Sequence, residues 1–156
     1  MENQKTCCLY ISTFHLFTII LPYIDEQIKA GKNIELLVQK DLSSDLKMYF
    51  EKVRGLKVDK NKILNLEWNS KSEISEYSEE KTIVIIGDEK FISYNERIII
   101  ENSLENHILS CYKMNNSLEI STVLLNHDEL LTTKRIRKIS KFSQNEQKTS
   151  TISSQL

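Results

Sequence analysis

The sequence predicts an α/β domain whose mostly parallel central sheet is flanked by helices. Apolar runs of strand length alternate along the chain with amphipathic runs of helix length. The run at 82–87 (TIVIIG) is β-branched almost throughout, which is typical of a parallel strand buried on both faces. The length of 156 residues is enough for one domain with its own core. Strands separated by helices favour a parallel sheet covered on both faces.

The start of the chain predicts a strand followed by a helix. Residues 7–11 (CCLYI) are typical of a buried strand, and residues 14–31 have the pattern of a helix. Thr13 is a candidate N-cap, and Gly31 a plausible C-terminal stop. Pro22 lies inside this segment and predicts a kink.

The next segments continue the strand and helix alternation. Residues 33–38 (NIELLV) predict a second strand, and residues 41–55 a second helix. The N-cap of that helix could be Asp41, Ser43 or Ser44, and its end could be Gly55. The alternating apolar residues of 62–68 (KILNLEW) predict a third strand, and the polar residues 69–81 a loop or a short helix.

The second half of the chain is less uniform. Residues 90–106 fit a strand by propensity and a helix by the spacing of their apolar residues. We expect a strand at 107–112, a helix over 117–131 that could break near His127, and a further helix over 132–142. Residues 1–142 would form the single domain, and the polar residues 143–156 a disordered tail.

Charge and cysteine content exclude several classes of protein. The net charge is −1, which counts against nucleic-acid binding, although one basic cluster occupies residues 134–141. Three cysteines make no disulfide framework, and the polar N-terminus has no signal-peptide layout, so we expect a cytoplasmic protein. The longest apolar stretch, residues 16–24, is too short to span a membrane.

The motifs of nucleotide and metal chemistry are missing. A P-loop needs glycines that let the backbone wrap phosphate, and this chain has three glycines in all. Its single Gly-Lys pair, Gly31-Lys32, lies at the end of a predicted helix and not at its start. The three histidines are scattered and Cys7 and Cys8 are adjacent, so we expect neither a metal site nor a cofactor.

Cys111 and His127 raise the question of catalysis, because a cysteine nucleophile needs a histidine within reach. Cys111 lies in an apolar run, where a free cysteine is usually a small core residue. We therefore favour structural roles for both, with the nucleophile and base as the competing interpretation. His15 could contact a ligand or be an ordinary helix residue. Asp88, which follows the strand at 82–87, could equally be a functional acid or a helix N-cap.

Four stretches together resemble one family. They are the opening strand, helix and strand with Gly31; IIGDEK with Gly87 and Asp88; NERIII with Glu96; and the stretch from Ile108 to Leu131. In their order they are similar to the MEDS domain, the methanogen/methylotroph sensory domain, a degenerate relative of the RecA- and KaiC-like fold. The resemblance covers roughly residues 5–135. In the last stretch an aspartate after the Cys-Tyr pair is missing and Asp128 replaces a proline, while Thr6 stands where the family commonly has a histidine.

The resemblance implies a degenerate RecA/KaiC-like three-layer sandwich and a sensory or signalling domain without catalytic residues. It would bind a small organic ligand in a degenerate nucleotide cleft and regulate transcription or a signalling partner. The candidate ligand-binding residues are Ser12, Thr13, His15, Asp88, Glu96, Tyr112 and His127. The competing hypothesis is a ligand-free protein-interaction module that regulates a transcription or sporulation factor and uses residues 132–156 or a surface helix.

Overall fold

The computed structural model describes residues 4–75, 80–102, 106–134 and 136–139, and within them the α/β prediction is confirmed. The described residues form a six-stranded sheet with the order β2-β3-β4-β1-β5-β6. Strands β1 to β5 run parallel, and β6 is antiparallel to β5. The strands are β1 (Gln4–Tyr10), β2 (Ile34–Val38), β3 (Lys81–Ile86), β4 (Asn106–Lys113), β5 (Glu129–Leu131) and β6 (Ile136–Lys138). The predicted tail at 143–156 lies outside the described residues.

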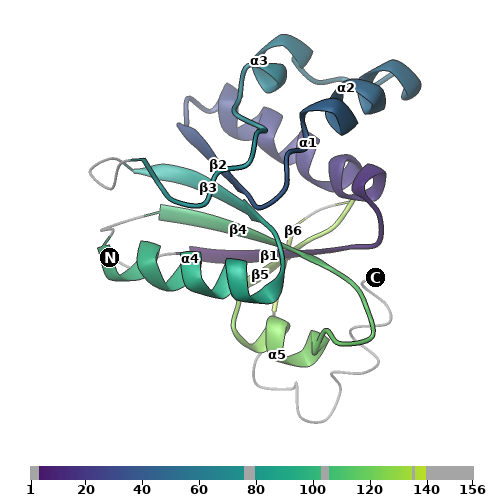
Figure 1. Ribbon diagram of the computed structural model, residues 1–156. Coiled ribbons are helices and arrows are strands. Elements are labelled where there is room, and N and C mark those ends of the chain that lie inside the picture. The colour runs from purple at the N-terminus through teal and green to yellow at the C-terminus, as the bar shows by residue number, and fades with distance from the viewer. Residues whose placement is uncertain (1–3, 76–79, 103–105, 135, 140–156) are drawn as a thin grey trace.

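Helices cover both faces of the sheet (Figure 1). On one face lie α1 (Thr13–Lys29), α2 (Ser43–Lys52) and α3 (Lys60–Leu64); on the other lie α4 (Glu89–Asn102) and α5 (Ile120–Leu125). Because successive strand residues point to opposite faces, each strand contributes to two cores. Cys8 and Cys111 face the α1 side, whereas Cys7 and Tyr112 face α4 and α5.

The opening strand, helix and second strand follow the sequence prediction. The N-cap of α1 is Ser12 and not Thr13, since the Ser12 hydroxyl accepts a hydrogen bond from the backbone N–H of His15. The helix ends just before Gly31, whose φ of 78° is left-handed and suits glycine at a helix C-terminus. Pro22 lies within the helix, which continues to Lys29.

The predicted strand at 62–68 is wrong, because this segment starts in the short helix α3. The Asp59 carboxylate caps that helix by accepting a hydrogen bond from the N–H of Lys62. Ile63 and Trp68 are both buried, and the Trp68 indole N–H donates to the Ile63 carbonyl at 2.7 Å. The apolar alternation therefore reflects burial of a helical turn and the loop that follows it.

The ambiguous segment at 90–106 is the helix α4 over most of its length. The buried residues of this helix recur at helical spacing; they are Ile92, Asn95, Glu96 and Ile99. This spacing therefore outweighs the strand propensity of the three consecutive isoleucines.

The predicted helices over 117–131 and 132–142 are wrong in part. Helix α5 covers only Ile120–Leu125, and the chain then forms β5 and β6. Strand β5 is fixed by pairing with β1, at whose start the Lys5 carbonyl accepts a hydrogen bond from the Asp128 N–H at 2.7 Å. Residues 140–142 lie outside the described residues. No helix among the described residues is long and apolar enough to cross a membrane.

Candidate functional site

A cleft of about 880 Å³ opens at the carboxyl ends of the strands. The chain leaves β1 toward α1 on one face of the sheet, but it leaves β3 and β4 toward α4 and α5 on the other. Parallel α/β sheets bind ligands at such a switch point. The cleft is lined by Tyr10, Thr13, Gln39, Lys40, Asp41, Leu42, Asp45, Ile86, Gly87, Asp88, Glu89, Lys90, Tyr112, Lys113, Asn115, Ser117 and Leu118.

Two tyrosines from neighbouring strands line the cleft. Tyr10 is the last residue of β1 and faces the α1 side, while Tyr112 on β4 faces the α5 side. Their side chains are almost fully buried, and burial raises the pKa of both phenols. Both therefore remain neutral hydroxyls that can donate and accept hydrogen bonds.

The rim between β2 and β3 is held by Gln39 and Asp88. The Asp88 N–H donates to the Gln39 side-chain oxygen at 2.8 Å, and the Gln39 amide donates back to the Asp88 carboxylate at 3.1 Å. The same carboxylate accepts the Phe91 N–H at 2.8 Å, so Asp88 caps the N-terminus of α4. Hydrogen bonds from Phe91 and Gln39 hold the Asp88 pKa below its usual value. The structure thus shows the capping role, and Asp88 also lines the cleft.

Gly87 lets this rim approach α4 closely. A Cβ atom at Gly87 would lie 2.5 Å from the Phe91 ring and 2.9 Å from the Gln39 side-chain oxygen. Both distances are too short for any other residue unless the neighbours move. The glycine is thus required for close packing between the end of β3 and the first turn of α4.

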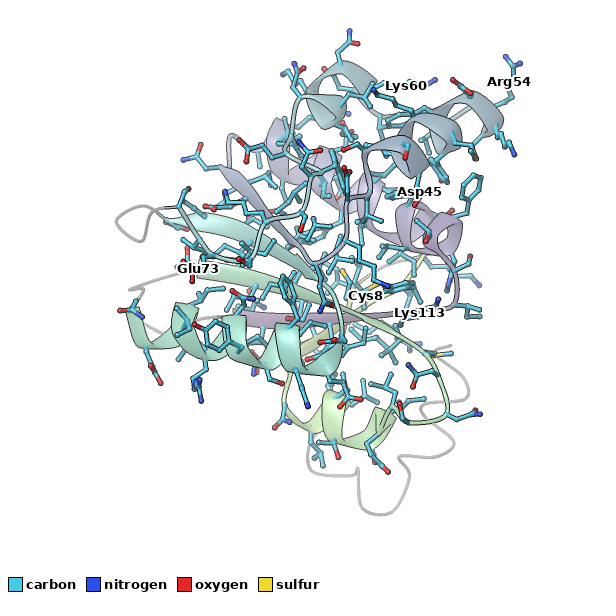
Figure 2. All side chains as sticks on the ribbon, viewed as in Figure 1. Cys8, Asp45, Arg54, Lys60, Glu73 and Lys113 are labelled. Carbon is cyan, nitrogen blue, oxygen red and sulfur yellow. The ribbon has the colours of Figure 1, made fainter. Side chains whose placement is uncertain are left out.

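Charged groups of both signs surround the opening. Figure 2 shows Asp45 on α2 and Lys113 at the end of β4. Both side chains are exposed, and so are Lys40 and Lys90. Acidic residues occupy the first turns of α2 and α4, whereas the first turn of α1 contains none. Lys113 directly follows a predicted strand and Lys40 lies two residues beyond one, so their position at strand ends is the sequence signal that points to them.

The seven candidate residues separate into three groups. Thr13, Asp88 and Tyr112 line the cleft. Ser12 and His15 do not line it; they shape the turn before α1, where the His15 Nδ1 accepts the Ile11 N–H at 2.9 Å. The structure therefore favours local structural roles for these two. Glu96 and His127 lie behind the cleft wall in a buried polar cluster.

The buried polar cluster consists of Lys5, Glu96, Ser110, Tyr112 and His127. The Glu96 carboxylate lies 2.8 Å from His127 Nε2, accepts the Ser110 hydroxyl at 2.5 Å and lies 3.4 Å from the Lys5 ammonium. His127 Nδ1 lies 2.6 Å from the carbonyl of Val123, and the Tyr112 hydroxyl lies 3.4 Å from Nε2. The cluster connects β1, β4, α4 and the junction between α5 and β5.

Hydrogen bonds and nearby charges keep Glu96 ionised although it is buried. Burial alone would raise the Glu96 pKa, but the hydrogen bond and charge of His127, with help from Ser110 and Lys5, bring it below its usual value. His127 Nδ1 donates a hydrogen bond to the Val123 carbonyl, and Nε2 faces the ionised Glu96 carboxylate. Both ring nitrogens of His127 thus have close partners inside the protein.

Cys111 and His127 do not come together. Cys111 is fully buried on the face covered by α1, whereas His127 belongs to the opposite face. Burial raises the pKa of the Cys111 thiol well above its usual value, which is contrary to the needs of a nucleophile. Within the described part of the chain, no three His, Cys, Asp or Glu side chains are grouped so that they could hold a metal ion.

Comparison of the chain with protein-family models, with curated proteins and with solved structures found no match.

Proposed function

We propose that this protein is a cytoplasmic sensory domain that binds a small organic ligand in the cleft and regulates a transcription or signalling partner. The carrying observation is the cleft at the switch point of the sheet, lined by Thr13, Asp88 and Tyr112. Its volume of about 880 Å³ suits a small molecule. The resemblance to the MEDS sensory domain supports the same assignment.

The lining favours an uncharged or zwitterionic ligand with an apolar part. Lysines and carboxylates are mixed around the rim, and Asp88 already accepts two hydrogen bonds from the protein. The acidic residues in the first turns of α2 and α4 disfavour the binding of a polyphosphate, because they occupy the helix ends that would otherwise attract anions. Tyr10, Leu42 and Leu118 supply apolar surface.

The test is a thermal-shift screen with two panels, one of nucleotides and one of small neutral and zwitterionic metabolites. A compound that binds the folded state raises Tm by mass action. We expect a shift from the second panel. Thr13→Val should weaken binding of that compound about fivefold, since a hydrogen bond contributes about 1 kcal/mol. Thr122→Val is the matched control, because Thr122 is an exposed threonine that does not line the cleft.

A screen without any shift would contradict the ligand proposal and favour the interaction module. One observation supports that alternative. Among the described residues, β6 is last in the strand order, and Ile136 on it is 42% exposed. A strand at the end of a sheet can pair with a partner chain.

A further inference from the structure

We propose that the contact between Tyr112 and His127 transmits occupation of the cleft to the edge formed by β5 and β6. This inference rests on the proposed ligand cleft, because it assigns the region of the protein that responds when the cleft is filled. It gives the buried polar cluster a role beyond stability.

Tyr112 is the one residue that belongs to both regions. Tyr112 lines the cleft, and its hydroxyl lies 3.4 Å from His127 Nε2. The rings of Tyr112 and His127 meet edge to face, with centroids 5.6 Å apart. A ligand that packs against the Tyr112 ring would therefore shift this ring against His127.

The contact between the Tyr112 hydroxyl and His127 is weak. At 3.4 Å it is longer than an ordinary hydrogen bond, while the same nitrogen makes a 2.8 Å contact with Glu96. A small displacement of Tyr112 can strengthen or break this contact at little cost. The bonds of His127 to Glu96 and Val123 are short and hold the imidazole in place.

His127 is directly followed by the residues that hold β5 and β6. The Asp128 N–H donates to the Lys5 carbonyl at 2.7 Å, and the Asp128 carboxylate accepts the Lys5 N–H at 3.0 Å. The Asp128 carbonyl accepts the N–H of Ile139, which follows β6, at 3.0 Å. One residue thus joins the end of the cluster, the start of β1 and the edge strand, so a shift of His127 reaches the edge through Asp128.

The experiment replaces the unknown ligand with a tethered group. Ser117 lines the cleft and is exposed, and Ser117→Cys can be labelled with benzyl methanethiosulfonate to place a benzyl group at the cleft. The natural cysteines are fully buried and do not compete for the reagent. Ser93→Cys carries the same label on the exposed side of α4, outside the cleft lining, and serves as control.

Amide hydrogen exchange of Asp128 and Ile139 is the readout, with Val38 on β2 as the reference. We expect the benzyl group at position 117 to slow exchange at Asp128 and Ile139 at least threefold and to leave Val38 unchanged. Tyr112→Phe in the same labelled protein should abolish the difference, and the label at position 93 should have no effect.

Two results would overturn the inference: no change at Asp128 and Ile139, or a change that persists without the Tyr112 hydroxyl. An equal change at Val38 would show general stabilisation and would overturn it as well. Because the tether needs no natural ligand, failure here is distinct from failure of the thermal-shift screen.

Discussion

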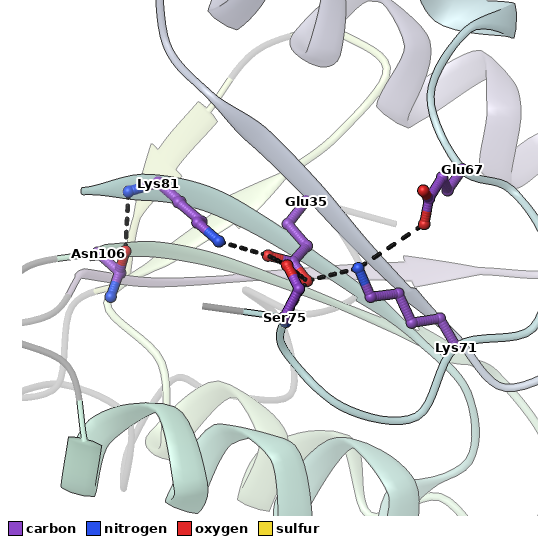
Figure 3. A network of polar contacts seen from close by, with 6 residues as sticks. All are labelled: Glu35, Glu67, Lys71, Ser75, Lys81 and Asn106. Atoms are coloured by element: carbon purple, nitrogen blue, oxygen red, sulfur yellow. Dashed lines mark hydrogen bonds and ion pairs between the residues drawn. The ribbon is translucent and has the colours of Figure 1, made fainter. Parts of the chain in front are cut away.

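Glu35 shows how a single buried charge holds a loop on the sheet (Figure 3). Its carboxylate lies 2.6 Å from the Lys81 ammonium and 2.7 Å from that of Lys71, and it accepts the Ser75 N–H at 2.8 Å. Burial alone would raise the Glu35 pKa, but the hydrogen bonds from Lys71, Lys81 and Ser75 outweigh it and lower the pKa to about 2. The carboxylate thus fastens the segment around Lys71 to the outer edge of β2, where Val38 and Lys71 form an isolated β-bridge.

Glu35→Gln should destabilise the protein by about 2 kcal/mol at pH 7, because two charge-assisted hydrogen bonds lose their ionised acceptor. The folded-state pKa lies below the unfolded value near 4.5, so this stabilisation is complete above pH 4.5 and is lost as the pH falls toward 2. Urea unfolding at several pH values should therefore show the gap between wild type and variant narrowing in that range.

Glu67→Gln is the matched control for Glu35. Its carboxylate is 75% exposed and lies 3.8 Å from the same Lys71, so its loss should change stability by less than about 0.5 kcal/mol. A gap between wild type and Glu35→Gln that stayed constant from pH 7 to pH 2 would contradict the assigned role of the carboxylate.

At the scale of elements, the cleft depends on how closely the end of β3 approaches α4. Gly87→Ala should cost about 1–3 kcal/mol, because the added methyl group overlaps the Phe91 ring and the Gln39 side chain. Displacing Gln39 also breaks its paired hydrogen bonds with Asp88, so the side-chain amide NMR signals of Gln39 should shift.

Gly55→Ala separates this packing effect from backbone strain. Gly55 has a φ of 74° and open space around it, so alanine there costs about 1 kcal/mol through strain alone and leaves the Gln39 signals unchanged. If Gly87→Ala destabilised the protein no more than Gly55→Ala and left the Gln39 signals in place, the close approach of the end of β3 to α4 would be contradicted.

The elements also show where sequence reasoning succeeds. The first two strands, their helix and the strand at 82–87 were predictable because each carries a period or a continuous apolar run that one local rule explains. Strands β5 and β6 have three residues each and exist because β1 offers an edge and Asp128 bonds to Lys5. This pairing depends on residues that are far apart in the sequence, so no local sequence pattern predicted it.

The candidate site was predictable to a similar degree. Thr13 and Asp88 follow predicted strands, where ligands of parallel sheets bind, and Tyr112 came from the family resemblance; all three line the cleft. Neither signal could separate the cleft wall from the cluster behind it, because Glu96 and His127 meet only when α4 and the α5–β5 junction pack on the same face of the sheet. Asp45 and Lys90 at the opening carry no local signal, since charged residues occur along the whole chain.

For the whole molecule, the two helical layers protect the centre of one sheet. Cys7, Cys8 and Cys111 lie on β1 and β4, which are neighbours inside the sheet, and all three are fully buried. Cys7 faces the α4 and α5 layer, and the other two face the α1 layer. Burial also raises the pKa of Cys7 and Cys111, which lowers the thiolate fraction further.

If the two layers unfold together, all three thiols should react with an aromatic disulfide reagent at one common rate under native conditions. If global unfolding costs about 5 kcal/mol or more, that reaction is slower by about four thousandfold or more than the reaction of an exposed thiol such as that introduced by Ser93→Cys. The rate should rise with urea along the slope of equilibrium unfolding, because the reactive state exposes the whole core. Mass spectrometry of the labelled peptides distinguishes the sites. Faster labelling of Cys7 alone would mean that the α4 and α5 layer, which carries the buried polar cluster, opens independently of the rest.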